Sequence, residues 1–256
     1  MLTEGRAKLA QAELLETEAK YRPFMYQQQM LENANNNYLI LQAERFLASV
    51  LRQETMDSLE DRVAITNLRA VQSVIEQACK ELSPHIDRIF LAGSLAKETA
   101  VKGSSDYDFF ISIKNSYTKS MCEIFNDLHD CLAIFFGHEA VRKQNVSIGL
   151  TLGDPSIDIV PGKQQNEYSD YHTIWKNKTQ SWTKTNVQKQ IDNVRRSGCA
   201  PYIRLIKVWR NCWRLDFPSI NLELSVLDTL GTNKNIPLRR AFGLILQYLL
   251  FVELLV

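Results

Sequence analysis

The chain has 256 residues, of which 45% are hydrophobic and 23% charged, a composition typical of globular proteins with one large domain or two lobes. Its formal net charge is +1, so total charge argues neither for nor against a nucleic-acid partner. The N-terminus is charged and carries no apolar stretch of the signal-peptide kind.

Helical patterns fill residues 1–84. The clearest spans about 60–82, and Ser83-Pro84 is expected to end it. Apolar residues recur there at the spacing of one helix face: Val71, Val74, Ile75, Ala78 and Leu82.

The pattern changes to alternation after Pro84. Residues 88–92 (RIFLA) and 106–113 (DYDFFISI) predict strands. Residues 146–160 predict a β-hairpin around a four-residue turn, Gly153 to Ser156.

From about residue 186 the helical pattern returns. Thr185 or Asn186 is expected to cap a helix that ends at Gly198. Pro201 suits the first turn of the next helix, whose one face carries Ile203, Ile206 and Trp213.

The five cysteines are odd in number and form no Cys-x-x-Cys pair: Cys79, Cys122, Cys131, Cys199 and Cys212. A disulfide framework or a zinc site would need tighter, paired spacing. We therefore expect reduced, buried thiols in a cytoplasmic protein.

The stretch from Ala241 to Val256 is apolar except for Gln247 and Glu253. It is shorter than the roughly 20 residues of a membrane span, so a buried helix is favoured over a membrane anchor. Because the sequence stops inside this pattern without a cap, we expect a C-terminal lobe that is cut short.

Three acidic residues are candidates for a metal site. Asp106 and Asp108 begin a predicted strand and project from one face. Asp158 interrupts a second apolar strand, and pairing of the two strands would bring the three carboxylates together. Such carboxylates repel one another unless a cation lies between them. We predict two Mg²⁺ ions, with Mn²⁺ as an alternative, in a phosphoryl-transfer site. Taken alone, an Asp-x-Asp pair at a strand edge is often only solvated.

Gly93-Ser94 follows the first predicted strand and opens a short predicted helix. This arrangement aims backbone N–H groups and a hydroxyl at an anion such as the phosphates of a nucleotide. Glycine allows the close approach that a side chain would block. For an isolated Gly-Ser pair, the alternative is a plain turn.

The stretch from Leu91 to Phe110, LAGSLAKETAVKGSSDYDFF, resembles the signature of the polymerase-β nucleotidyltransferase superfamily. Gly93-Ser94 is followed after eleven residues by Asp106-Tyr107-Asp108 and, fifty residues later, by Asp158. The form is most similar to the CD-NTases, the cGAS/DncV-like enzymes, with oligoadenylate synthetases and archaeal-type CCA-adding enzymes as relatives. Glu98 stands where this form has a glycine.

The element pattern and the resemblance together predict an α+β fold, a polymerase-β-like nucleotidyltransferase core whose small mixed sheet is flanked by helices. We expect N-terminal helices packing on the core at 1–84, the palm with the metal site at 85–170, and a helical lobe at 171–256.

The resemblance extends to residues 203–209 (IRLIKVW) and 217–224 (FPSINLEL). It implies that Lys207 and Ser219 contact a triphosphate from the side opposite Ser94, and both are suitable donors for phosphate. Without the resemblance, Lys207 would be a solvated helix lysine, and Trp209 and Trp213 are expected to be packing residues.

The implied reaction is magnesium-dependent joining of nucleoside triphosphates, ATP, GTP or others, with release of pyrophosphate. The product would be a cyclic or linear oligonucleotide messenger of a bacterial antiphage type. One alternative is a template-independent RNA nucleotidyltransferase of the CCA-adding sort. Another is a catalytically silent nucleotide-binding or antitoxin-like module, which the three acids argue against and the short chain argues for.

Between Lys176 and Arg214 the chain carries ten basic residues and one acidic residue, Asp192. Such a surface suits nucleotide phosphates and could also hold RNA, whereas an ordinary solvated helix face carries mixed signs. RNA and a regulatory protein are therefore further candidate partners. The base specificity and the oligomeric state do not follow from the pattern.

Overall fold

The computed structural model describes residues 2–56, 58–103, 106–151, 153, 156–231 and 235–253. The chain divides into two compact units, residues 1–49 and residues 50–256. Helix α1 spans Leu2–Glu54. It makes up the first unit, and its last residues, 50–54, are counted with the second unit. The side chains of residues 27–42 are all exposed.

The second unit is an α+β domain built on one seven-stranded mixed sheet. Its strands are β1 (Ile86–Leu91), β2 (Tyr107–Ile113), β3 (Val141–Lys143), β4 (Ile148–Leu150), β5 (Ile157–Gln164), β6 (His172–Lys176) and β7 (Ser181–Thr185). Its helices are α2 (Ser58–Ala78), α3 (Gly93–Ala96), α4 (Met121–Phe136), α5 (Val187–Ser197), α6 (Ala200–Cys212), α7 (Ser219–Leu230) and α8 (Leu238–Glu253). Short 3₁₀ turns occupy Ser83–His85 and Asn177–Thr179.

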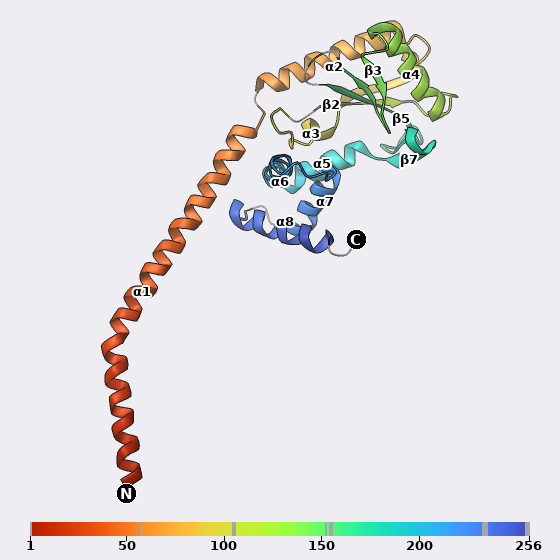
Figure 1. Ribbon diagram of the computed structural model, residues 1–256. Helices are drawn as coiled ribbons and strands as arrows, with labels where there is room; N and C mark the ends of the chain where they lie inside the picture. Colours follow the sequence, from red (N-terminus) through yellow and green to blue (C-terminus); the bar gives the residue numbers. More distant parts are fainter. Residues whose placement is uncertain are drawn as a thin grey trace. The chain divides into compact units, whose positions relative to one another are not determined.

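The strand order is β1-β2-β5-β4-β3, and β6 pairs with the far end of β5 and with β7. Only β2 and β5 run parallel, and every other pair is antiparallel. Figure 1 shows α2 and α4 on one side of this sheet and the helices α5 to α8 on the other. The sequence predicted β1, β2, β4 and β5 but not β3, β6 or β7.

Alternation along β2 decides which face is apolar. Phe109, Ile111 and Ile113 are fully buried in one cluster with the core residues of α2 and α4. Because successive side chains of a strand point to opposite faces, Asp108 lies on the other face, toward the C-terminal helices. The same alternation along β5 places Asp158 on the face that carries Asp108.

The ends of α5 and the start of α6 lie where the sequence predicted them. The Asn186 side chain caps α5 by accepting from the Lys189 N–H at 2.8 Å, and Gly198 ends it in the left-handed conformation. Pro201 lies in the first turn of α6.

The predicted hairpin is β4–β5, but Leu150 pairs with Ile157, so six residues separate the strands rather than four. Of the segment predicted here, Leu152, Asp154 and Pro155 lie outside the described residues.

A disulfide joins Cys79, next to the end of α2, to Cys131 in α4. The expectation of reduced thiols is therefore wrong for this pair. The two cysteines are 52 residues apart, a spacing that carries no pairing signal. They meet because α2 and α4 pack against each other on one face of the sheet. Cys122, Cys199 and Cys212 are free.

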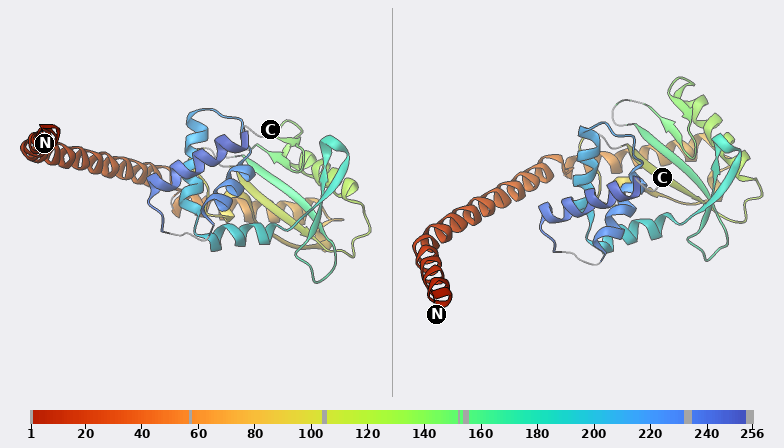
Figure 2. Two further views of the ribbon diagram at one scale, coloured as in Figure 1. Left: turned by 90° about the horizontal axis from the view of Figure 1, so that it is seen from below. Right: turned by 60° about the horizontal axis from the view of Figure 1, so that its bottom comes forward.

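The C-terminal helices form a second apolar cluster, and both views of Figure 2 show them gathered together (cyan to blue). Ile203 and Ile206 of α6 are buried in it, as predicted, and Trp209 packs against it. Trp213 was expected on the same face, but α6 ends at Cys212 and the Trp213 side chain is 69% exposed.

The apolar C-terminal stretch forms most of α8. Ala241, Ile245 and Leu249 are buried in the second cluster, which agrees with the predicted buried helix. None of the helices in the described part of the chain has the length and apolar character that a membrane crossing requires.

Candidate active site

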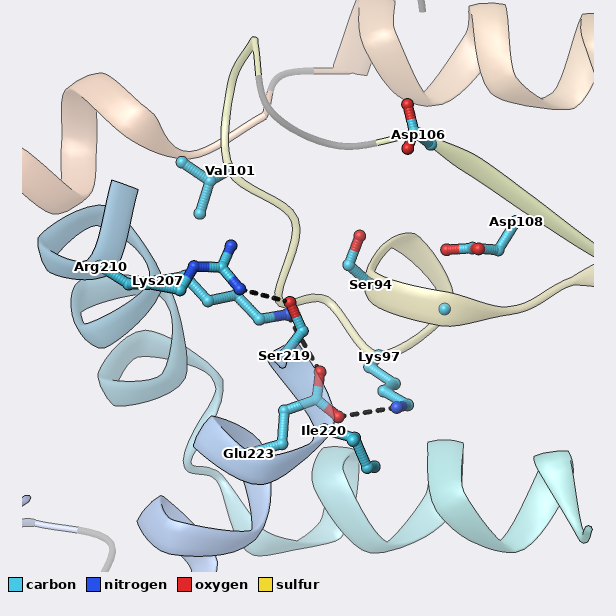
Figure 3. A pocket seen from close by; sticks show the side chains of 11 residues that line it. Ser94, Lys97, Val101, Asp106, Asp108, Lys207, Arg210, Ser219, Ile220 and Glu223 are labelled. Atoms are coloured by element: carbon cyan, nitrogen blue, oxygen red, sulfur yellow. Dashed lines mark hydrogen bonds and ion pairs between the residues drawn. The ribbon is translucent and has the colours of Figure 1, made fainter. Parts of the chain in front are cut away.

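A cavity of about 280 Å³ opens between β2 and α3 on one side and α6 and α7 on the other (Figure 3). It is lined by Gly93, Ser94, Lys97, Val101, Asp106, Asp108, Lys207, Arg210, Ser219, Ile220 and Glu223. Six of the seven residues predicted for the site are in this set. The seventh, Asp158, lies beside Asp108 on the neighbouring strand.

At the start of α3, the backbone of Gly93 lies directly against the side chain of Asp108. Gly93 adopts a φ of +56°, and a Cβ at this position would overlap the Asp108 carboxylate. The Asp108 carboxylate also accepts a hydrogen bond from the Ser94 backbone. Only glycine permits this approach, so Gly93 is required by the geometry as well as by the turn.

The acidic residues come together through the parallel pairing of β2 and β5, in which Asp108 and Asp158 are direct partners. The sequence left the pairing of these two strands as a condition, and in the structure they do pair. Each outer carboxylate has its own partners. Asp106 accepts from the Ser156 hydroxyl at 2.5 Å. Asp158 accepts from the Gln144 amide at 2.8 Å and from the Ser147 hydroxyl at 3.4 Å.

Burial and mutual repulsion weaken the acidity of this group. The pKa of Asp108 is raised to about 6, first by burial and then by the charges of Asp158 and Asp106. Burial and the charge of Asp106 also raise the pKa of Asp158. Burial and the neighbouring charges thus both disfavour the ionised carboxylates in the folded protein, and a bound cation would offset both effects.

The chemistry of these donors fits Mg²⁺, since they are carboxylate oxygens on one face, and burial and neighbouring charge raise the pKa of Asp108 and of Asp158. Among the described residues, however, no three His, Cys, Asp or Glu side chains stand close enough together to hold a metal ion as a set. Asp106 and Asp158 are held by Ser156 and by Gln144 with Ser147. These side chains must turn away from their present partners to share an ion, and the metal site stays a prediction.

The opposite wall holds a buried network that sequence analysis missed. Glu223 of α7 pairs with Lys97 at 2.7 Å and with Lys207 at 3.0 Å, and all three side chains are less than 10% exposed. Thr99 joins the network by accepting from Lys207 at 3.0 Å. Lys207 is thus in the cavity wall as predicted, but its ammonium group already has a carboxylate partner.

A single carboxylate, Glu223, partly compensates two buried ammonium groups in this network. Burial lowers the pKa of Lys207 despite the attraction of Glu223. Burial alone would raise the pKa of Glu223, but Lys207 and Lys97 together hold it below its ordinary value. Glu223 therefore stays ionised between two cations, which agrees with the rule that buried charges are paired.

Ser219 is the first residue of α7, and its hydroxyl accepts from the Arg210 guanidinium at 2.9 Å. Arg210 and Lys207 are the two members of the basic run that line the cavity. Arg210, Lys97 and Glu223 were not predicted as site residues. The available signal was their position inside the segments that carried the resemblance, or one residue beyond them.

The position at which the resembling motif has glycine, Glu98, keeps a glycine-like backbone, with φ +61°. Two arginines hold it. Arg204 of α6 donates to the Glu98 carbonyl at 2.5 Å, and Arg195 of α5 pairs with its carboxylate at 3.4 Å. The loop between α3 and β2 therefore has its shape fixed by the C-terminal helices.

A family model described as the Second Messenger Oligonucleotide or Dinucleotide Synthetase domain (SMODS) matches residues 43–197. The chain belongs to this family. It is a nucleotidyltransferase of the CD-NTase type, with the polymerase-β-like core that the sequence predicted. The match covers the three acidic residues, α3 and α5 but ends before Lys207, Arg210 and Ser219. A search of curated proteins finds no match.

Solved CD-NTase structures share the fold at low sequence identity. CdnC of E. coli MS115-1 with ATP is 18% identical, with 82% of this chain and 72% of that chain covered and a TM-score of 0.65. CdnG of Bradyrhizobium diazoefficiens in complex with GTP is 14% identical, with 80% and 75% covered and a TM-score of 0.67. The CdnE c-UMP-AMP synthase of Rhodothermus marinus is 16% identical, with 78% and 81% covered and a TM-score of 0.59.

Proposed function

We propose that this SMODS protein joins nucleoside triphosphates, with release of pyrophosphate, into a cyclic or linear oligonucleotide second messenger. Magnesium dependence, a role in bacterial antiphage defence and a cytoplasmic location are parts of the same proposal. The observation that carries it is a single cavity with crowded carboxylates on one wall and hydroxyl and cationic groups on the other.

Nucleoside triphosphates are the substrate class that this charge pattern favours. The Ser94 and Ser219 hydroxyls offer hydrogen-bond donors to phosphate oxygens, and the Arg210 guanidinium lies beside Ser219. Related structures hold such ligands, since E. coli CdnC was solved with ATP and B. diazoefficiens CdnG with GTP. Asp106, Asp108 and Asp158 would hold Mg²⁺. When bound, the ions would neutralise phosphate charge and lower the pKa of an attacking hydroxyl.

The reaction needs an acceptor hydroxyl, a base and a leaving group. The acceptor oxygen bonds to the α-phosphorus as the bond to the β-phosphate oxygen breaks, and pyrophosphate leaves toward the wall of α6 and α7. Asp158, as the ligand expected nearest the attacking hydroxyl, assists its deprotonation in this scheme. Ser94 and Ser219 stabilise charge on the departing phosphates.

The test is to incubate the full chain with Mg²⁺ and the four ribonucleoside triphosphates and to analyse phosphatase-resistant products by mass. We expect an oligonucleotide product that falls on the order of a thousandfold or more in the Asp106→Asn, Asp108→Asn double variant. Asp228→Asn, an exposed carboxylate on α7, is the matched control and should keep wild-type yield. Equal yield from the double variant would refute the assignment of the acids.

The same assay separates the alternative functions. Product that forms only when RNA is added, and that extends the RNA, would replace the messenger proposal by an RNA nucleotidyltransferase. Binding of triphosphates without any product, with or without RNA, would favour the catalytically silent module. A regulatory protein as activator would appear as product formed only in its presence.

A further inference from the structure

We propose that Arg210 is a positioning residue for the triphosphate, and that it acts by orienting the Ser219 hydroxyl toward the phosphates. This inference rests on the proposed function. Arg210 and Ser219 come from different helices, the last turn of α6 and the first residue of α7, and both line the cavity. Figure 3 shows the guanidinium beside the Ser219 hydroxyl.

The guanidinium of Arg210 is fixed by three groups of the protein. Its Nε and one terminal nitrogen donate to the Asn211 side-chain oxygen at 3.1 and 2.9 Å. The other terminal nitrogen donates to the Phe217 carbonyl at 3.0 Å and to the Ser219 Oγ at 2.9 Å. A planar fork anchored at this many points holds one orientation with little further loss of side-chain entropy.

The direction of the last hydrogen bond sets the role of the serine. A serine hydroxyl has one hydrogen to donate and an oxygen that accepts. Because Ser219 Oγ accepts from Arg210, its own hydrogen is the part left to be donated, and the residue faces the cavity. Ser219 is thereby prepared as a donor to an anion such as a phosphate oxygen, and the positive charge behind it strengthens that donation.

The bond to Phe217 fixes the approach of the chain to α7. The Phe217 carbonyl precedes Pro218, which occupies the N-cap position of α7 and makes no side-chain cap hydrogen bond. Arg210 thus holds both the oxygen before the helix start and the hydroxyl at the helix start. Without these two hydrogen bonds, the Ser219 side chain would lose the partner that sets the orientation of its hydroxyl.

The Arg210→Lys variant tests whether position 210 needs the geometry of arginine or only its positive charge. Lysine keeps the positive charge but has a single nitrogen on a flexible stem, so it cannot hold Asn211, Phe217 and Ser219 together. If Arg210 acts through Ser219, Arg210→Lys and Ser219→Ala should weaken binding to a similar extent. The double variant should then be no worse than either single variant.

The measurement is calorimetric binding of inorganic tripolyphosphate, and of ATP and GTP, to the full chain in Mg²⁺. We expect each single variant, and the double variant, to bind about tenfold more weakly than wild type, as for the loss of one hydrogen bond to a charged group. Arg196→Lys, an exposed arginine on α5, is the control and should bind like wild type. Melting temperatures of all variants report whether they fold.

Two results would overturn the positioning role. Wild-type affinity in Arg210→Lys would show that only charge is needed at this position. Multiplied losses in the double variant would show that Arg210 contacts the phosphates directly rather than through Ser219. Failure of the wild-type chain to bind tripolyphosphate or any of the nucleotides would instead refute the proposed function, so the two failures are distinguishable.

Discussion

The two walls of the cavity solve the problem of buried charge in opposite ways. On the wall of β2 and β5, which we call the acidic wall, burial and then the charges of Asp158 and Asp106 raise the pKa of Asp108 to about 6. On the wall of α6 and α7, which we call the basic wall, Glu223 lies within 3.0 Å of Lys207 and of Lys97, which follows α3. On the first wall like charges lie together, whereas on the second each buried ammonium group has a carboxylate partner.

The difference teaches that one chemical change should have opposite effects on the two walls. Replacing a carboxylate by its amide removes repulsion on the acidic wall and removes compensation on the basic wall. Stability measured without metal or nucleotide should therefore rise in the first case and fall in the second. Such a contrast distinguishes residues arranged for an external cation from residues arranged for the fold.

The largest effect is expected for Glu223→Gln. The amide leaves the ammonium groups of Lys97 and Lys207 buried without a counter-charge, and breaking a buried pair in this way costs about 3–5 kcal/mol. Chemical denaturation of the variant and of wild type measures this loss in the free energy of unfolding. Asp228→Asn on the same helix is exposed and should change it by no more than about 0.5 kcal/mol. An unchanged stability in Glu223→Gln would mean that the network is not formed in solution.

A smaller effect of opposite sign is expected for Asp108→Asn. The folded pKa of about 6 exceeds the ordinary value of 3.8, so ionised Asp108 destabilises the fold above pH 6, and stability returns as the pH falls toward 4. In the presence of a chelator, the variant should gain up to about 3 kcal/mol over wild type at pH 7.5.

The gain in Asp108→Asn should shrink to about 1 kcal/mol at pH 4.5, because folded Asp108 is largely protonated there and only the cost of protonating it, relative to the unfolded chain, remains. Thermal unfolding at the two pH values checks the prediction. Added Mg²⁺ should also raise the melting temperature of wild type more than that of the variant. A variant that is less stable than wild type at pH 7.5 would contradict the view that ionised Asp108 destabilises the fold.

The smallest effect is expected for Glu98→Gly, in the loop that links the two walls. Glycine relieves about 1–2 kcal/mol of left-handed strain but adds backbone entropy to the unfolded chain and loses the exposed pair with Arg195. We expect a net change within about 1 kcal/mol, read by denaturation. Glu98→Ala keeps the strain and loses the pair, so it should be the less stable of the two. The reverse order would show that the pair with Arg195 outweighs the strain.

The face on which each of the three acids lies could be predicted from the sequence, because strand alternation has a fixed period. Asp106 and Asp108 had to share a face, and Asp158 had to point away from Ile157 and Ile159. Their adjacency followed once two strands were paired. The caps of α5 were equally local, since Asn186 and Gly198 act within one turn of the helix.

The basic wall could not be predicted in the same way, because its partners are distant in the chain. Glu223 meets Lys97 across 126 residues, and neither residue has an intrinsic preference for the other. The Cys79–Cys131 disulfide likewise depends on how α2 and α4 pack. The β6–β7 hairpin was missed because its connection has Gln180 in the left-handed conformation, at φ +48°, where the usual signal is glycine or asparagine.

The parallel pairing of β2 with β5 also bears on the stage of folding at which Asp158 can come beside Asp108. Asp108 and Asp158 are partners across fifty residues that include α4, β3 and β4. Closing such a connection has an entropic cost that is recovered only after the intervening elements have packed. We therefore expect Asp158 to join Asp106 and Asp108 only late in folding, so that a partly folded chain would not yet have the three carboxylates together.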